Sequence, residues 1–327
     1  MRIATLQFNP TLGAVEANMA RATALLASLP PLDLLVLPEM AFTGYNFRNL
    51  EAITPHLEPT AAGPTTAWAV ATATRLRCAV TVGYPETATG AAVAAPPANY
   101  NASVTVSPHG RVLLHYRKAF LYYSDESWAR EGPGPGDGDG GGDASRTPFF
   151  CGPLPGLGVV AHGICMDINP YRFTAAWGEY EFATCAVRGG ARLVVLSMAW
   201  LTRLAAEELG REPGRPDLET VAYWIERLRP LVDGETAGGE GEGVVVVVAN
   251  RCGTERNEGG KTTLASGEVV DLGDPVCYAG SSCVMKLSGG RVNIFGGEDG
   301  PAIMGRADEG VLVVDTKEIA RYALTSG

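Results

Sequence analysis

Apolar and polar positions along the chain follow two periods in turn, and this alternation predicts strands and helices that succeed one another. The segment IATLQF (3–8) has the character of a strand, whereas EANMARATALLASL (16–29) has apolar residues at helical spacing. The same criteria predict strands at 33–40, 78–85, 101–106, 111–120, 159–166, 191–200, 244–251, 281–287 and 310–316, and helices at 65–77, 174–190 and 217–232. The chain is therefore predicted to be an α/β protein.

Several of these strands are apolar at nearly every position, as in VVVVVA (244–249). A strand of this kind is buried on both faces, so the sheets are expected to be covered by helices. Two segments, 131–145 and 233–243, interrupt the alternation of predicted strands and helices. Both are rich in glycine and acidic residues and are expected to be flexible loops. Because strands and helices continue to alternate on both sides of each loop, residues 1–327 are predicted to form a single domain.

The composition of the chain limits the kinds of partner that the protein is expected to bind. A net charge of -10 and a pI near 5.0, without a local basic run, argue against binding to nucleic acid. No apolar segment approaches the length of a membrane span, and the start MRIATLQFNP lacks the features of a signal or transit peptide. The seven cysteines are widely spaced and form no CxxC pair, which is typical of a reducing compartment such as the cytoplasm.

Two kinds of bound group are not expected. The four histidines are scattered and no HExxH or paired Cys/His spacing occurs, so no metal site is predicted. The glycine run at 131–143 lacks a Gly-Lys-Ser/Thr ending, which argues against a phosphate-binding loop. No glycine fingerprint follows the first strand, so a dinucleotide-binding oxidoreductase is not favoured either.

Cys165 stands apart from the other cysteines by its position. It lies in GICMDINP (163–170), where an apolar strand is predicted to end and a helix to begin. Such a turn resembles a nucleophile elbow, although the second glycine of that motif is missing, and Cys165 taken alone could be a buried structural thiol. A free thiol is mostly protonated at neutral pH, so a nucleophilic Cys165 needs a base and a cation nearby. His162 is not expected to be that base, because positions i and i+3 of a strand point to opposite faces.

Two charged residues at the ends of other predicted strands can supply this activation. Glu39 comes directly after Pro38, which ends an apolar strand in VLPEM, and Lys118 lies at the end of another strand in LLHYRKAF. Each alone could be a solvated charge, but an ionised group directly after a buried strand is costly, and α/β active sites collect at the carboxyl ends of strands. Glu39, Lys118 and Cys165 are therefore the candidate catalytic residues.

These three positions also carry a family resemblance. LVLPEMAFTGYNF, HYRKAFLYYSDE and GICMDINPYRF resemble the three signatures of the nitrilase, or carbon–nitrogen hydrolase, superfamily. Supporting similarity runs from IATLQFNPTLGAVEANM to ANRCGTE and DPVCYAGSS. Within the superfamily, PEMAFTGYNF, KAFLYYSDESW and GICMDINPYRF are most similar to fungal-type protein N-terminal amidases, which deamidate N-terminal asparagine and glutamine.

The resemblance implies a four-layer α-β-β-α sandwich with the site at one end of the paired sheets. It implies that Glu39 is the general base and acid and that Cys165 is the nucleophile of a thioester pathway. Lys118 and the backbone N–H of Met166 are then expected to stabilise the oxyanion. Glu126 is expected to support the site by holding Lys118, and no cofactor is implied.

The implied substrate is the N-terminus of a peptide or protein, as in an N-degron pathway. Such a substrate needs an anionic or carbonyl-lined pocket for its α-ammonium group. Asp167 and Asp125 are candidates for that pocket, although Asp167 is alternatively interpreted as a brace for the elbow. Tyr45 and Trp200 are candidates for the mouth of the pocket.

The Glu-Lys-Cys triad leaves other functions open. A small-molecule amidase, a nitrilase or an N-carbamoyl hydrolase would use the same triad and the same kind of cysteine-bound intermediate. A non-catalytic binding protein of this fold is disfavoured because all three residues are present. The sequence also leaves open the preference between Asn and Gln, the role of the loop at 131–145 and whether the chain forms a homodimer.

Overall fold

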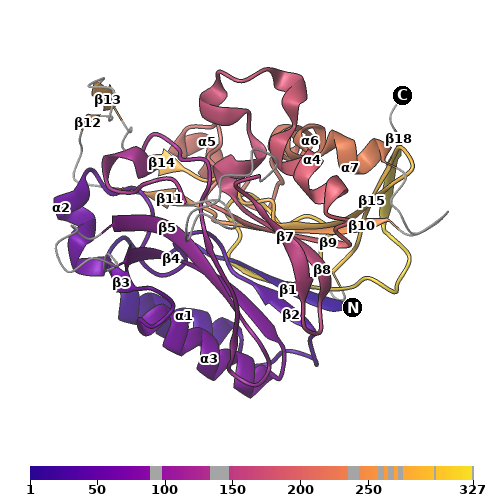
Figure 1. The fold of residues 1–327 in the computed structure, drawn as a ribbon, viewed down its shortest axis with the longest axis horizontal. Coiled ribbons are helices and arrows are strands. Elements are labelled where there is room, and N and C mark those ends of the chain that lie inside the picture. Colours follow the sequence, from indigo (N-terminus) through magenta and orange to yellow (C-terminus); the bar gives the residue numbers. More distant parts are fainter. Residues whose placement is uncertain are drawn as a thin grey trace.

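The computed structural model describes residues 1–88, 98–132, 147–234, 243–256, 261–263, 269–271, 275–297 and 300–325. Two β-sheets face each other at the centre of the molecule, and helices cover the outer face of each sheet (Figure 1). This arrangement confirms the predicted α-β-β-α sandwich. The glycine-rich segments 131–145 and 233–243 lie almost wholly outside the described residues, and the assignment of a single domain stays a prediction.

The first sheet has the strand order β17-β1-β2-β4-β5-β6, with the short β3 paired to β4. Strands β1, β2 and β4 run parallel, and β6 points the same way because β5 is antiparallel to both of its neighbours. The bounds are β1 (Arg2–Gln7), β2 (Leu34–Val36), β3 (Glu58–Pro59), β4 (Ala79–Ala88), β5 (Ala98–Val106), β6 (Val112–Arg117) and β17 (Gly310–Asp315).

The second sheet has the order β18-β16-β15-β10-β9-β8-β7, with β8, β9 and β10 parallel at its centre. The edge strand β7 was not predicted; its sequence FCGPL contains Gly152 and Pro153, which are tolerated mainly at a sheet edge. The bounds are β7 (Phe150–Leu154), β8 (Gly158–Ile164), β9 (Leu193–Met198), β10 (Val244–Asn250), β15 (Cys283–Ser288), β16 (Arg291–Ile294) and β18 (Tyr322–Thr325).

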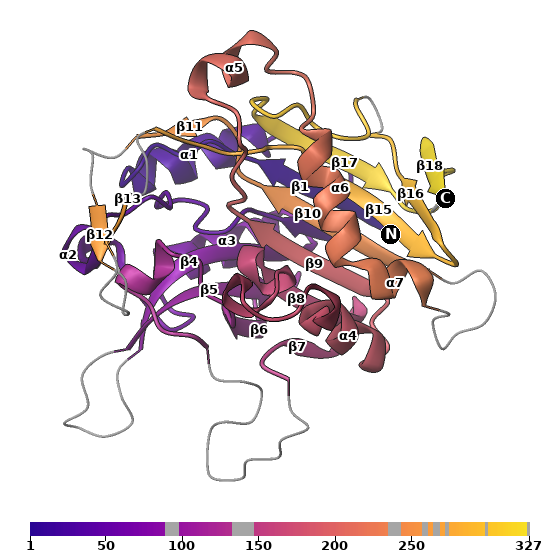
Figure 2. The ribbon, with the colours of Figure 1, turned by 90° about the horizontal axis from the view of Figure 1, so that it is seen from above.

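The helices form the two outer layers. Helices α1 (Val15–Leu25) and α3 (Pro64–Leu76) pack on the first sheet, and α4 (Glu181–Arg188), α6 (Leu218–Arg227) and α7 (Arg229–Asp233) pack on the second (Figure 1). Figure 2 shows that the segment with α5 loops outward beside the start of α6. The remaining short elements are α2 (Leu50–Ile53), α5 (Ala206–Arg211), β11 (Thr254–Glu255), β12 (Lys261–Thr263), β13 (Val269–Asp271) and β14 (Val276–Cys277).

Strand β10 shows why a run of valines suits this architecture. Val244, Val246 and Val248 pack toward the helices of the second sheet, whereas Val247 and Ala249 pack between the two sheets. All five side chains are completely buried, because both faces of the strand meet apolar layers. The uninterrupted apolar sequence is therefore what a central strand of the sandwich requires.

Two predicted helices are shorter than expected. The segment 174–190 becomes α-helical only at Glu181, because Tyr180 has a positive φ of 46° and separates this helix from the preceding 3₁₀ turn, Trp177–Glu179. The segment 217–232 divides after Arg227 into α6 and α7, since Pro230 cannot donate the backbone hydrogen bond that a continuous helix needs.

The parallel strands of both sheets deliver their carboxyl ends to one side of the sandwich. The hydroxyl of Ser197, on β9, donates a hydrogen bond of 3.0 Å to the carbonyl of Leu37, just past β2, and so joins the two sheets at this edge. Loops that follow β2, β6, β8 and β9 consequently meet there. Among the described helices, none combines the length and the apolarity needed to cross a membrane.

Candidate active site

Three strand ends bring Glu39, Lys118 and Cys165 to this edge of the paired sheets. Glu39 follows β2, Lys118 follows β6, and Cys165 comes directly after β8. The ammonium nitrogen of Lys118 lies 2.6 Å from Oε1 of Glu39, and both side chains are completely buried. The charges of both residues act on the thiol of Cys165. The structure thus gathers the three candidate residues in one buried cluster.

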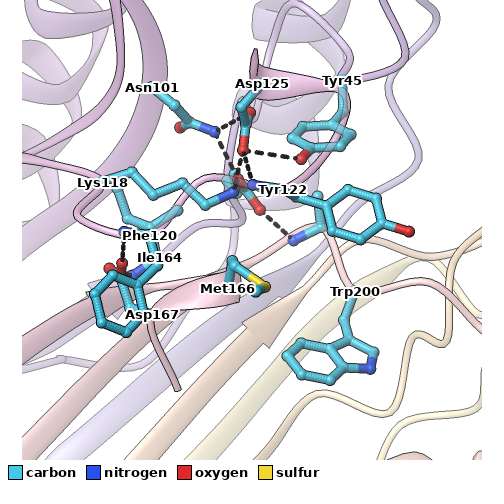
Figure 3. Close-up of polar contacts among 12 residues, drawn as sticks. Tyr45, Asn101, Lys118, Phe120, Tyr122, Asp125, Ile164, Met166, Asp167 and Trp200 are labelled. Carbon is cyan, nitrogen blue, oxygen red and sulfur yellow. Dashed lines mark hydrogen bonds and ion pairs between the residues drawn. The ribbon is translucent and has the colours of Figure 1, made fainter. Parts of the chain in front are cut away.

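Lys118 has a second anionic partner, which is Asp125 rather than the predicted Glu126. Its ammonium nitrogen lies 2.6 Å from Oδ2 of Asp125, and the same oxygen accepts hydrogen bonds from the hydroxyl of Tyr45 (3.2 Å) and the N–H of Tyr122 (3.1 Å) (Figure 3). Glu126, itself among the described residues, is only partly buried and forms no hydrogen bond with Lys118. In a 3₁₀ turn, successive side chains point in different directions, so the prediction was wrong by one position.

The placement of Asp125 also excludes it from the predicted ammonium pocket. Its side chain is completely buried and does not line the cavity described below. Oδ1 accepts a further hydrogen bond of 3.0 Å from the amide of Asn101, so both oxygens are engaged inside the cluster. Asp125 is therefore a carboxylate that holds Lys118 in place.

Three hydrogen bonds fix the carboxylate of Glu39. Oε1 accepts from Lys118 and from the amide of Asn101, each at 2.6 Å, and Oε2 accepts from the backbone N–H of Ala199 at 2.8 Å. Burial raises the pKa of Glu39 above its ordinary value of 4.5, while the positive charge of Lys118 opposes this rise. Asn101 and Ala199 gave no recognisable signal in the sequence, because one is a common strand residue and the other acts through its backbone.

The loop that carries Glu39 lies against the backbone of β4 at Gly83. A Cβ atom at Gly83 would approach the Cα of Glu39 to 2.8 Å and the backbone nitrogen of Met40 to 2.7 Å. These separations are shorter than real Cβ contacts, so a side chain at this position would displace Glu39. Gly83 is a residue of the site that acts only by having no side chain.

Cys165 occupies a strained turn. Its φ of +44° is rarely adopted by residues other than glycine, and a short 3₁₀ turn, Cys165–Ile168, follows it. Strain of this kind persists only when the surrounding contacts impose it. The predicted elbow is therefore present as a strand followed by a tight turn, with a single 3₁₀ turn where a helix was expected.

Asp167 supplies the contacts that impose this turn. Its Oδ2 accepts hydrogen bonds from the N–H of Ile164 and the hydroxyl of Tyr116, both at 2.8 Å. Just after Lys118, the N–H of Ala119 donates to Oδ1 of Asp167 at 3.1 Å. The N–H of Phe120 donates to the same oxygen at 2.8 Å (Figure 3). Burial raises the pKa of Asp167 to about 6.

With four donors satisfied inside the protein, Asp167 has no oxygen left for a substrate ammonium group, and it does not line the cavity. Of the two interpretations of this residue, the brace is correct and the ammonium pocket is wrong. The same carboxylate joins the turn at Cys165 to the segment that follows Lys118.

The surroundings of the Cys165 thiol favour its protonated form. Burial and the negative charge of Glu39 raise its pKa well above the ordinary value, and the charge of Lys118 and the backbone N–H of Ala199 only partly offset this. A buried thiol of this kind cannot rely on spontaneous ionisation, so its reactivity requires a base within reach. Glu39 is the charged group that acts most strongly on this thiol.

His162 does not take part in this cluster, as its position on the strand predicts. Its Nε2 lies 2.7 Å from the hydroxyl of Ser103, and its ring packs edge-on against Tyr116 at 5.2 Å. Complete burial lowers its pKa to about 3, so the imidazole stays neutral. Among the described residues, no group of three or more His, Cys, Asp or Glu side chains is arranged to hold a metal ion.

A cavity of about 990 Å³ opens onto Cys165. Its inner walls are aromatic, and both residues predicted for its mouth, Tyr45 and Trp200, line it. The ring of Trp200 packs against Tyr223, with 5.4 Å between ring centroids, and Tyr122 lines the cavity as well. Met166 contributes to the lining directly beside the nucleophile.

Asp217 is the least exposed of the carboxylates that line this cavity. Its Oδ2 accepts a hydrogen bond of 2.6 Å from the hydroxyl of Thr202, and its Oδ1 accepts one of 3.1 Å from the N–H of Thr220 at the start of α6. It is half-buried, whereas the other carboxylates of the lining are exposed, namely Glu208, Glu212 and Glu219. Asp217 was not predicted, because nothing in the sequence places the start of α6 near Cys165.

Comparison with known proteins defines the class of this chain. Residues 2–176 match the family model described as carbon–nitrogen hydrolase, and the chain belongs to that family, which confirms the resemblance of its three signatures. By class it is a hydrolase of carbon–nitrogen bonds. The protein N-terminal amidase of Schizosaccharomyces pombe is 32% identical over 330 residues, which cover 96% of this chain and 98% of the relative.

Solved structures of N-terminal amidase share the fold. One with an Asn-Glu peptide superposes with a TM-score of 0.69, and one with a Gln-Gly peptide with a TM-score of 0.68. Each is 18% identical in sequence and covers 96% of this chain and 96% of its own. At this identity, the likeness establishes the architecture.

Single substitutions of Asp125 and of Glu126 distinguish the roles of these two adjacent carboxylates. We expect Asp125→Asn to lower the kcat of amide hydrolysis by about a hundredfold, because Lys118 loses the ionic contact that aims it. Glu126→Gln should change kcat less than about twofold, as is usual for a surface position. Steady-state measurement of ammonia release from both variants checks this, and equal losses would contradict the assignment of Asp125.

Proposed function

We propose that this protein hydrolyses the side-chain amide of an N-terminal asparagine or glutamine, releasing ammonia and leaving aspartate or glutamate. The observation that carries the proposal is the buried Glu39–Lys118 pair beside Cys165 on a cavity of about 990 Å³. The relative named protein N-terminal amidase, which matches nearly the whole of both chains, supports the choice of substrate. Such a reaction changes the first residue of a protein, which suits an N-degron pathway in the cytoplasm.

The first half of the reaction forms a thioester. Glu39 accepts the thiol proton while Sγ of Cys165 bonds to the side-chain amide carbon, whose oxygen becomes an oxyanion. The ammonium of Lys118 and the backbone N–H of Met166 stabilise that oxyanion. Glu39 then gives its proton to the amide nitrogen, the carbon–nitrogen bond breaks, and ammonia leaves.

The second half of the reaction restores the enzyme. Glu39, again ionised, takes a proton from water as the water oxygen bonds to the thioester carbon. When the tetrahedral intermediate collapses, the carbon–sulfur bond breaks and the proton returns to the sulfur of Cys165. The product is a side-chain carboxylic acid. The steps of the proposed scheme use protein groups and water, without a metal or organic cofactor.

A substrate recognised at its N-terminus presents an α-ammonium group a few bonds from the amide carbon. Asp125 and Asp167 are occupied inside the protein, so another anion must receive this group. Asp217 lines the cavity and keeps its charge in a fixed position through Thr202 and the start of α6. We assign the ammonium contact to Asp217, with the aromatic walls adding cation–π attraction.

A pair of peptides tests the substrate class. We expect an Asn-initiated peptide to exceed its N-acetylated copy in kcat/KM by about a hundredfold or more, because the acetylated peptide has no ammonium charge to pair with Asp217 and its acetyl group must fit in the space of that ammonium group. Release of ammonia measures both, and Cys165→Ala, which should abolish turnover while preserving the melting temperature, is the control. Equal turnover of the two peptides would favour a small-molecule amidase instead.

Removal of one charge tests the ammonium contact. Asp217→Asn should raise the KM of the free peptide roughly tenfold, which corresponds to the loss of about 1.4 kcal/mol of binding. Asparagine is as good a helix cap as aspartate, so the melting temperature should change little. Glu219→Gln, which changes an exposed carboxylate of the same cavity, is the matched control, and similar KM values for the two variants would refute the role of Asp217.

The pH dependence of the reaction reports the state of Glu39. The proposed base must be ionised, and burial raises its pKa above 4.5. The value of kcat/KM should therefore fall as the pH drops through an apparent pKa above 4.5, and it should recover when the pH is raised again. A profile that stays flat down to pH 4.5 in a protein that remains folded by circular dichroism would exclude Glu39 as the base.

A further inference from the structure

The segment ANRCGTE (249–255) ends in a buried ion pair behind the active site. Arg251 pairs with Glu255, and their side chains are 0% and 1% exposed. The guanidinium lies over the ring of Tyr278 at 4.4 Å, and the hydroxyl of Tyr278 donates a 3.0 Å hydrogen bond to Glu255. None of these three residues lines the cavity that opens onto Cys165.

The other contacts of Glu255 are with the loop that carries Tyr45. Its two carboxylate oxygens accept from the N–H of Tyr45 at 3.1 and 3.2 Å, and Oε1 also accepts from the N–H of Asn46 at 2.6 Å. Gly44 lets the loop approach this closely, because a Cβ at that position would lie 2.7 Å from Oε2 of Glu255. The backbone of Tyr45 is thus fixed by one buried carboxylate.

The side chain of Tyr45 continues from that anchor into the catalytic cluster. Its ring lies 5.5 Å from the ammonium nitrogen of Lys118, and its hydroxyl donates to the same oxygen of Asp125 that accepts from Lys118. A shift of the Tyr45 backbone would therefore move a donor off Asp125 and change the direction in which Lys118 points. We propose that Glu255 is a positioning residue, which aims Lys118 at the reaction centre through Tyr45 and Asp125.

A purely structural role would not require this pair. A buried ion pair is costly to desolvate, and well-packed apolar residues of similar volume often give equal or greater stability. Nε and Nη1 of Arg251 have no hydrogen-bond partner among the described residues, which adds to that cost. What apolar residues could not supply is a fixed acceptor for the N–H groups of Tyr45 and Asn46.

The test uses the rate at which iodoacetamide alkylates Cys165, measured as a function of pH. This measurement needs no substrate, so it remains informative if the proposed function is wrong. The thiol faces the charges of Glu39, Lys118 and Asp125 and the phenols of Tyr45 and Tyr122. Lys118 is the sole cation among these groups, so a poorly aimed Lys118 should move the alkylation profile to higher pH.

We expect Glu255→Gln to slow alkylation at pH 8 by roughly fivefold and to shift its profile upward, with a similar effect from Tyr45→Phe. The double variant should be no slower than either single variant, because both act through the hydrogen bond to Asp125. Independent, multiplying effects, or an unchanged profile in folded Glu255→Gln, would overturn the proposal. On an Asn-initiated peptide, kcat should fall more than KM changes, a readout that does rest on the proposed function.

Two further variants separate positioning from stability. Glu58 is as deeply buried as Glu255, because each is 3% exposed when the whole residue is counted, and it accepts a 2.8 Å hydrogen bond from the N–H of Thr65, which lies outside the cluster. Glu58→Gln should lower the melting temperature but leave the alkylation profile unchanged; a shifted profile in this control would overturn the proposal. If Glu255→Gln fails to fold, Arg251→Met combined with Glu255→Gln removes both charges, and an unchanged profile in that folded protein would also overturn it.

Discussion

The rest of the site depends on one ammonium group held between two carboxylates in the protein interior. Burial alone would drive the proton off Lys118, but the charges of Asp125 and Glu39 raise its pKa instead, so the cation persists. Two anions facing one cation leave the cluster short of positive charge. Burial, followed by the repulsion between neighbouring negative charges, raises the pKa of both Glu39 and the Cys165 thiol, and a raised pKa makes Glu39 a better proton acceptor.

Such a cluster requires an anchor for each member, and the anchors come from distant parts of the chain. Asn101 on β5 donates to both Glu39 and Asp125, and the N–H of Ala199 after β9 donates to Glu39. Because both sheets contribute, the site exists only when the sandwich is assembled. The interlayer packing of strands such as β10 is therefore also a condition for the chemistry.

The sequence pattern sufficed to predict sheets covered by helices and the candidate residues, whereas the four-layer arrangement followed from the family resemblance. Apolar strands with charges directly after them pointed to Glu39 and Lys118, and the elbow-like turn pointed to Cys165. Glu126 was predicted as the partner of Lys118 in place of Asp125, because the orientation of one 3₁₀ turn decides which of these adjacent carboxylates faces inward. Asn101, Gly83 and Asp217 act through backbone approach or through the meeting of remote segments, which no local pattern reveals. The helix of 174–190 was overestimated because a positive φ at Tyr180 cannot be read from periodicity.

The carboxylate of Asp167 accepts from Ile164 on one side and from Ala119 and Phe120 on the other. The turn at Cys165 and the segment that follows Lys118 are thereby joined through one buried carboxylate, although more than forty residues of chain separate Cys165 from Lys118. The position of Cys165 relative to Lys118 is therefore set by the contacts of Asp167 and not by the length of the chain between them. Asp125 lies in the same stretch and must still reach Lys118, so changes of chain length are compatible with this geometry only after Asp125 and before the start of β7.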